Sequence, residues 1–154
     1  MRRAALFVLL LYTSVCVFTS CREVPDAHAM MCDFARDFGI YGAIYSPSVP
    51  EGEDGYTTPD LISRIYLTGE VIPSDYAVIL NCRADYGAEC GVFVCDSEAE
   101  CTAAIEMCEE RLRILSRGDG NALLIRSGNT VFYSTLTDHE RAEHLWRKIV
   151  ASHT

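Results

Sequence analysis

The stretch that decides the fold is DYAVILNCRADYGAECGVFVC, residues 75–95. It holds two apolar runs, 76–82 and 91–95, and the residues between them carry charges and a glycine. Short apolar runs bounded by turn-forming residues are typical of buried strands. The stretch therefore predicts a β-hairpin whose two strands lie in the core.

A helix should follow this hairpin directly. Ser97 and Glu100 have the spacing of a capping box, in which each side chain satisfies a backbone N–H at the start of a helix. The apolar residues after them recur at helical spacing and end at Arg117-Gly118. They are Cys101, Ala104, Ile105, Cys108, Leu112 and Leu115.

The same order of elements then occurs a second time. Residues 122–125 and 130–136 predict another hairpin around Ser127-Gly128-Asn129. Thr137 and Glu140 suggest a second capping box. The final helix is expected to bury one apolar stripe: Ala142, Leu145, Trp146, Ile149 and Val150.

Upstream of the first hairpin, Asp26 can cap an N-terminal helix that Gly39 ends. Its predicted buried stripe is Ala27, Met30, Met31, Phe34, Ala35 and Phe38. Residues 40–75 contain four prolines and the acidic stretch 51–55, so they predict a long loop interrupted by one short helix. Thr58 caps this helix, Pro59 takes its first position and 60–67 form its body.

Together these elements predict an α+β fold. An N-terminal helix and two strand-strand-helix units would give a two-layer sandwich, with a four-stranded antiparallel sheet and the helices on one of its faces. Within the first hairpin we expect Cys82 opposite Cys90. That register puts Val78 and Leu80 beside Val94 and Val92, on the face that packs against the helix bearing Cys101 and Cys108.

The N-terminus has the features of a signal peptide. Arg2 and Arg3 precede fifteen uncharged residues, 4–18, which are too few to span a membrane. Thr19-Ser20-Cys21 resembles the lipobox of bacterial lipoproteins, in which the cysteine accepts the lipid. We expect residues 1–20 to be a signal peptide, and 21–154 a single domain lipid-anchored through Cys21 on the extracytoplasmic face of the cell membrane. Cleavage after Ala27-His28-Ala29 and an uncleaved anchor remain alternatives.

The charge of the chain bears on its partners. Its formal net charge is −9, and removal of residues 1–20 takes away two arginines and no acidic residue, which gives −11. Binding of nucleic acid requires clustered Lys and Arg, so nucleic acid is not an expected partner.

Six cysteines remain after Cys16 and Cys21, and their spacings match no zinc-binding arrangement. They are Cys32, Cys82, Cys90, Cys95, Cys101 and Cys108. We expect no metal site, no cofactor and no catalytic residue, and we expect His28, His139, His144 and His153 to lie on the surface. Disulfides stay open as a possibility, and Cys82 with Cys90 is the pair most able to meet.

Three tyrosines flank the acidic stretch of the long loop: Tyr41, Tyr45 and Tyr56. Tyrosines on a loop can stack on sugars or peptides, so these residues are the candidate binding surface. The alternative is that they fold back and cover one end of the core.

The segment NALLIRSGNTVFY, residues 121–133, is followed by a helix. With the lipoprotein-like start, the hairpin 76–95 and the helix through Arg111, it resembles small uncharacterised lipoproteins of Gram-positive bacteria that form a domain-of-unknown-function family. The resemblance covers residues 21–150 and implies a membrane-anchored domain without assigned activity. This chain differs from that pattern in its many cysteines.

These observations favour a noncatalytic module that binds a protein, a peptide or a glycan. A structural accessory subunit of a cell-envelope complex is the first alternative. A thiol-dependent enzyme is the second, and it would require a partly exposed thiol beside a histidine in a cleft.

Overall fold

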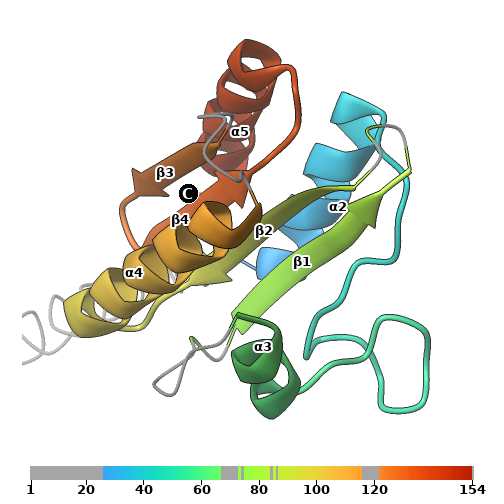
Figure 1. Cartoon of the computed structure of the whole chain (residues 1–154), viewed down its shortest axis with the longest axis vertical. Coiled ribbons are helices and arrows are strands. Elements are labelled where there is room, and N and C mark those ends of the chain that lie inside the picture. Colours follow the sequence, from blue (N-terminus) through green and yellow to red (C-terminus); the bar gives the residue numbers. More distant parts are fainter. Residues whose placement is uncertain are drawn as a thin grey trace, which may run out of the picture.

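The computed structural model describes residues 26–66, 73, 75–83, 85, 87–115 and 122–153. In this part of the chain four helices accompany one open antiparallel sheet (Figure 1). The predicted α+β class and four-stranded sheet are confirmed. The strand order is β1-β2-β4-β3, so the two hairpins join through β2 and β4. The strands are β1 Asp75–Cys82, β2 Ala88–Val94, β3 Leu123–Ser127 and β4 Thr130–Ser134.

The helices begin close to the predicted capping residues. They are α2 Ala27–Phe38, α3 Pro59–Tyr66, α4 Glu98–Leu115 and α5 His139–His153. The Asp26 carboxylate accepts hydrogen bonds from the N–H groups of His28 and Ala29 at the start of α2. Gly39 ends this helix with a φ of 82°, a left-handed conformation that glycine adopts without strain.

The capping box predicted for α4 is present, but the one predicted for α5 is not. Ser97 Oγ accepts a hydrogen bond from Glu100 N, and the Glu100 carboxylate accepts one from Asp96 N. At α5 the carboxylate of Asp138 accepts from Arg141 N instead. Thr137 Oγ1 donates to Asp85 Oδ2, so its hydroxyl is used by a tertiary contact and not by the helix.

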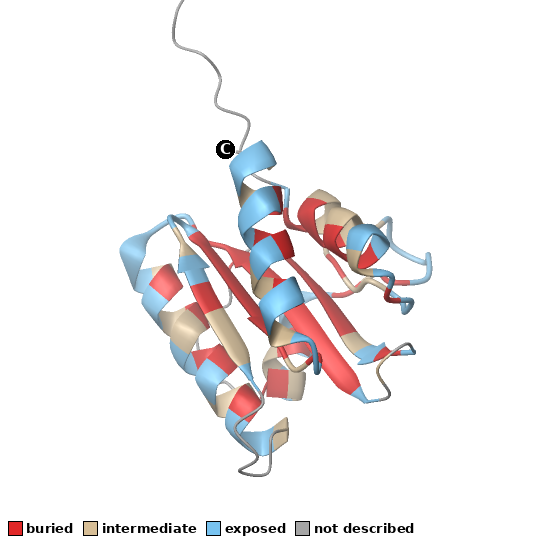
Figure 2. Ribbon diagram, turned by 90° about the horizontal axis from the view of Figure 1, so that it is seen from above, coloured by how far each residue is buried: buried red, intermediate tan, exposed pale blue. Residues whose placement is uncertain are grey.

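The prediction that the helices lie on one face of the sheet is wrong. Helices α2 and α5 cover one face and α3 and α4 cover the other, which gives three layers. Alternate residues of a strand point to opposite faces, and in β1 both sets are apolar: Ala77 and Ile79 on the α2/α5 side, Tyr76 and Val78 on the α4 side. All seven residues of β2 are buried, and Figure 2 shows the strands coloured mostly as buried.

The predicted hairpin register is also wrong. Ile79 lies opposite Cys90 and Cys82 lies opposite Ala88, with a β-bulge between Ile79 and Cys82. Val78 lies opposite Gly91. Val78 and Leu80 do face α4 as expected.

Val92 and Val94 were expected on the same face as Val78 and Leu80, but they face α2 and α5. Successive residues of a strand face opposite sides of the sheet. A change of the pairing by one position therefore changes which residues of the partner strand share a face with a given side chain.

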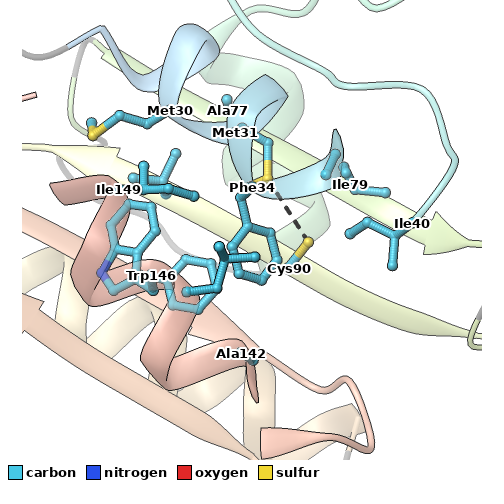
Figure 3. Close-up of a cluster of buried hydrophobic side chains, with 14 of the residues drawn as sticks. Met30, Met31, Phe34, Ile40, Ala77, Ile79, Cys90, Ala142, Trp146 and Ile149 are labelled. Atoms are coloured by element: carbon cyan, nitrogen blue, oxygen red, sulfur yellow. Dashed lines mark hydrogen bonds between the residues drawn. The ribbon is translucent and has the colours of Figure 1, made fainter. Parts of the chain in front are cut away.

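The core under α2 and α5 is built on aromatic rings (Figure 3). The Trp146 indole stacks on Phe132 with 4.4 Å between ring centroids and 11° between planes. Phe34 of α2 reaches the same Phe132 ring at 4.9 Å. Trp146 is fully buried, as its place in the apolar stripe of the last helix predicted.

Candidate functional site

The loop between α2 and α3 runs along the free edge of β1. Tyr45 N donates to Val78 O at 2.8 Å, and Val78 N donates to Tyr45 O at 2.9 Å. Farther along the strand, Arg83 N donates to Tyr41 O at 2.9 Å. These bonds use backbone groups of β1 that would otherwise form an open sheet edge.

The loop backbone lies very close to β1 at Gly42. A Cβ at this position would lie 2.8 Å from Ile79 Cγ2 and 3.1 Å from Asn81 O. Glycine therefore permits the close approach, and the approach fixes the backbone next to Tyr41.

The three candidate tyrosines do not share one surface. Tyr41 is 71% exposed, whereas Tyr45 and Tyr56 are half-buried. Tyr45 packs against the core cluster on the α4 side, so for this residue the alternative of covering the core is correct.

Tyr56 lies toward the opposite end of β1 from Tyr41. The Tyr56 backbone pairs with Ser46, and Tyr56 is close enough to Tyr76, the second residue of β1, to act on its pKa, which burial chiefly raises to about 12. Tyr41 bonds to Arg83, just beyond the end of the strand. Tyr76 and Arg83 are seven residues apart, or about 23 Å along an extended chain. Of the three candidate tyrosines, Tyr41 therefore remains as the candidate binding residue.

The end of the molecule that carries Tyr41 also carries the C-terminus of α2 and the start of α5. Arg141 of α5 lies over the Phe38 ring, 4.5 Å from its centroid, and donates to Asp37 O at 3.2 Å. These contacts join the two helices close to the point where the loop begins. Tyr41 thus extends from a backbone that is bonded to β1 at this end of the fold.

A pocket of about 340 Å³ lies at the opposite end of the sheet, where β2 ends and α4 begins. Cys95, Cys101 and Asn129 contribute to its wall, and so do Glu98 and Arg126. Arg126 donates through Nη1 and Nη2 to the two carboxylate oxygens of Glu98, at 2.6 and 2.5 Å. The positive charge at the pocket is therefore already paired.

The chemistry of this pocket does not favour nucleophilic attack by a thiolate. Burial raises the pKa of Cys95, and its hydrogen bond with the Cys101 thiol raises it further. A thiol with a raised pKa stays protonated at neutral pH, and the protonated form is a poor nucleophile.

Sequence reasoning missed a buried ion pair on the α4 side of the sheet. Arg111 of α4 meets Glu89 of β2, and beside them the hydroxyls of Tyr66 and Tyr133 form a hydrogen bond. A signal was present in the sequence: Glu89 lies next to an apolar run, and Arg111 follows Cys108 by three residues on the buried stripe of its helix. Both partners are satisfied internally, which is typical of a structural pair.

Cys32 is the described cysteine with the greatest exposure, on α2. Burial, Asp33 and Asp26 raise its pKa, and no histidine is among the groups that act on it. His153, expected on the surface, lies at the end of α5, where its Nε2 is 3.1 Å from Asp33 Oδ2. Among the described residues, no group of three or more His, Cys, Asp or Glu side chains could hold a metal ion. No described helix is long and apolar enough to cross a membrane.

No protein-family model, curated protein or solved structure matches this chain. The predicted lipid attachment at Cys21 falls outside the described residues.

Proposed function

We propose that the chain is an exported lipoprotein, anchored to the membrane through Cys21, and that its domain is a noncatalytic binding module with Tyr41 at the centre of the binding surface. The first part is supported by the charged start, the apolar run 4–18 and the small residues before Cys21. The second part is supported by one observation, the exposure of Tyr41 on a fixed backbone.

In this proposal the residues between Cys21 and the folded domain form a tether, and its length sets how close the domain is to the lipid. Four residues lie between Cys21 and Asp26, the cap of α2, and the five steps from Cys21 to Asp26 span at most about 17 Å when extended. Helix α2 has 12 residues and is therefore about 18 Å long. Its N-terminus is next to the tether, and Tyr41 follows its C-terminus. The tyrosine is thus at the end of α2 that is farther from the anchor.

Tyr41 has the properties of an interface anchor. Its side chain has few rotatable bonds and offers a large apolar ring face and a hydroxyl. Tyrosine is enriched among the interface residues that contribute most of the binding energy. Because the loop is already bonded to β1, little backbone entropy remains to be lost on binding. The partner class that fits is a peptide, a protein or a glycan that stacks on the ring.

Site-specific photocrosslinking in the native cells tests this proposal. A photoreactive phenylalanine analogue replaces Tyr41 in one strain and Leu61, which is 45% exposed on α3, in a matched control strain. We expect one discrete adduct from position 41 that is absent from position 61. Equal labelling at both positions, or none at position 41, would remove Tyr41 from the binding surface.

A further inference from the structure

Four of the six described cysteines meet in two pairs. Cys82 lies beside Cys90, and Cys95 beside Cys101, close enough for the two thiols of each pair to interact. Strand β2 supplies Cys90, and Cys95 directly follows the end of the strand. The two pairs lie on opposite faces of the sheet, the first in the core under α2 and the second in the core under α4.

The first pair is created by the bulge in β1. Cys82 lies opposite Ala88, two residues from Cys90, and both cysteine side chains belong to the α2 side of the sheet. The Cys90 sulfur also lies 3.9 Å from Met31 Sδ, which holds it under the helix (Figure 3).

The second pair joins the end of β2 to the first turns of α4. Cys95 N donates to Asn129 O at 2.8 Å, and Cys101 N donates to Ser97 O at 3.0 Å, so both backbones are fixed. Both residues contribute to the wall of the pocket described above.

The geometry excludes two other combinations. Cys90 and Cys95 are five residues apart along extended chain, about 16 Å, and they face opposite sides of the sheet. Cys101 and Cys108 are about 10 Å apart along α4. Both separations exceed the roughly 7 Å between Cα atoms that a disulfide tolerates.

We propose that the folded chain forms two disulfides under oxidising conditions, Cys82–Cys90 and Cys95–Cys101, and leaves Cys32 and Cys108 as thiols. In the cell, the reaction depends on the export included in the proposed function, because disulfides persist in oxidising compartments. For each bond two thiols lose two protons and two electrons. A small-molecule or protein disulfide accepts them through a mixed disulfide and is released as two thiols.

The test uses the full chain, reduced and denatured, then refolded in detergent with a mixture of glutathione and glutathione disulfide. Free thiols are alkylated in acid-quenched samples, and the unreduced protein is cleaved after arginine and glutamate for mass spectrometry. This cleavage puts Cys82, Cys101 and Cys108 on separate peptides but leaves Cys90 and Cys95 together on residues 90–98. We expect the peptide 90–98 to be linked to both the Cys82 and the Cys101 peptides.

Single variants assign the two links. Cys90→Ala should release the Cys82 peptide and keep the Cys101 link, and Cys95→Ala should do the reverse. Cys108→Ala is the matched control and should leave both links intact. Eight free thiols after refolding, or any link from Cys32, Cys108 or the two N-terminal cysteines to these four, would overturn the pairing.

The same mapping on protein alkylated during lysis of the native cells separates this inference from the proposed function. Disulfide-linked peptides in the refolded and in the cellular sample support both the pairing and the export. Links after refolding but free thiols in the cell would contradict the oxidising location, and hence the export, while the pairing would stand.

Discussion

Arg111 of α4 forms a two-point ion pair with Glu89 of β2. Nη2 lies 2.6 Å from Oε1 and Nε lies 3.0 Å from Oε2. The side chains are only 16% and 6% exposed, so both charges are largely removed from water. Nη1 donates to Ile65 O at 3.1 Å, and the guanidinium lies 5.5 Å from the centre of the Tyr66 ring. One arginine therefore joins α3, α4 and the sheet.

Removing one partner of this pair should be costly. Glu89→Ala leaves the Arg111 charge buried without its counterion, and such a loss costs about 3–5 kcal/mol of unfolding free energy. Glu110→Ala is the matched control, because it removes a carboxylate whose partner, Arg113, is mostly exposed. Urea denaturation of both variants checks the prediction. A Glu89→Ala protein as stable as the control would show that the pair does not stabilise the fold.

Trp146→Ala should also destabilise the domain strongly. The variant removes the ring that stacks on Phe132 and leaves a cavity in the core under α2 and α5, for a loss of about 3–5 kcal/mol. Trp146→Phe keeps an aromatic ring and should lose less. If thermal unfolding of Trp146→Ala matched that of the parent, the tryptophan would have no role in the core.

Helix and strand positions could be predicted from the sequence because their signals are local. The capping box of Ser97 and Glu100 indicates where α4 begins, and Gly39 indicates where α2 ends. The number of layers depends on which face of the sheet each helix covers. The spacing of apolar residues along a helix does not reveal that face. The uninterrupted apolar runs of β1 and β2 nevertheless carried a signal, because a strand with one solvent face alternates apolar and polar residues.

The candidate site was less predictable for a similar reason. Tyr41 and Tyr45 are four residues apart in the same loop, yet Tyr41 is exposed and Tyr45 is half-buried, because the pairing of Tyr45 with Val78 holds it against the core on the α4 side. The pairing is a long-range contact that composition does not reveal. The two thiol pairs depend likewise on the bulge in β1 and on the turn from β2 into α4.

Gly91 should not tolerate a side chain. A Cβ there would lie 2.5 Å from Tyr133 Cε1 and 2.9 Å from Val78 Cγ1, so Gly91→Ala should cost about 1–3 kcal/mol of stability through overpacking. Adding Val78→Ala makes room, so the double variant should lose less than the sum of the single variants. Additive losses measured by urea denaturation would argue against the steric cause.

Asp75 should make stability depend on pH. Burial raises its pKa, Asp26 and Asp96 raise it further, and the hydrogen bond from Ala27 N opposes them. With the folded-state pKa above the unfolded value of about 3.9, the favourable contribution is complete below that value. It is lost as the pH rises through the folded-state pKa.

Asp75→Asn tests this dependence, because it keeps an oxygen acceptor for Ala27 N and removes the charge. The stability of the variant relative to the parent should rise between pH 3.5 and pH 7 in urea denaturation. Asp54→Asn removes a charge of the same sign from the exposed loop and serves as the control. A constant or falling difference for Asp75→Asn would contradict the assigned cause.

The most direct test of the proposed export and anchoring is the intact mass of the protein recovered from the membrane fraction of its native cells. We predict a mature chain that begins at Cys21 and carries lipid on that residue, and a Cys21→Ala variant that keeps residues 1–20 and takes up no acyl label. A soluble mature chain that begins at Met30, or an N-terminal cysteine without lipid, would contradict the account.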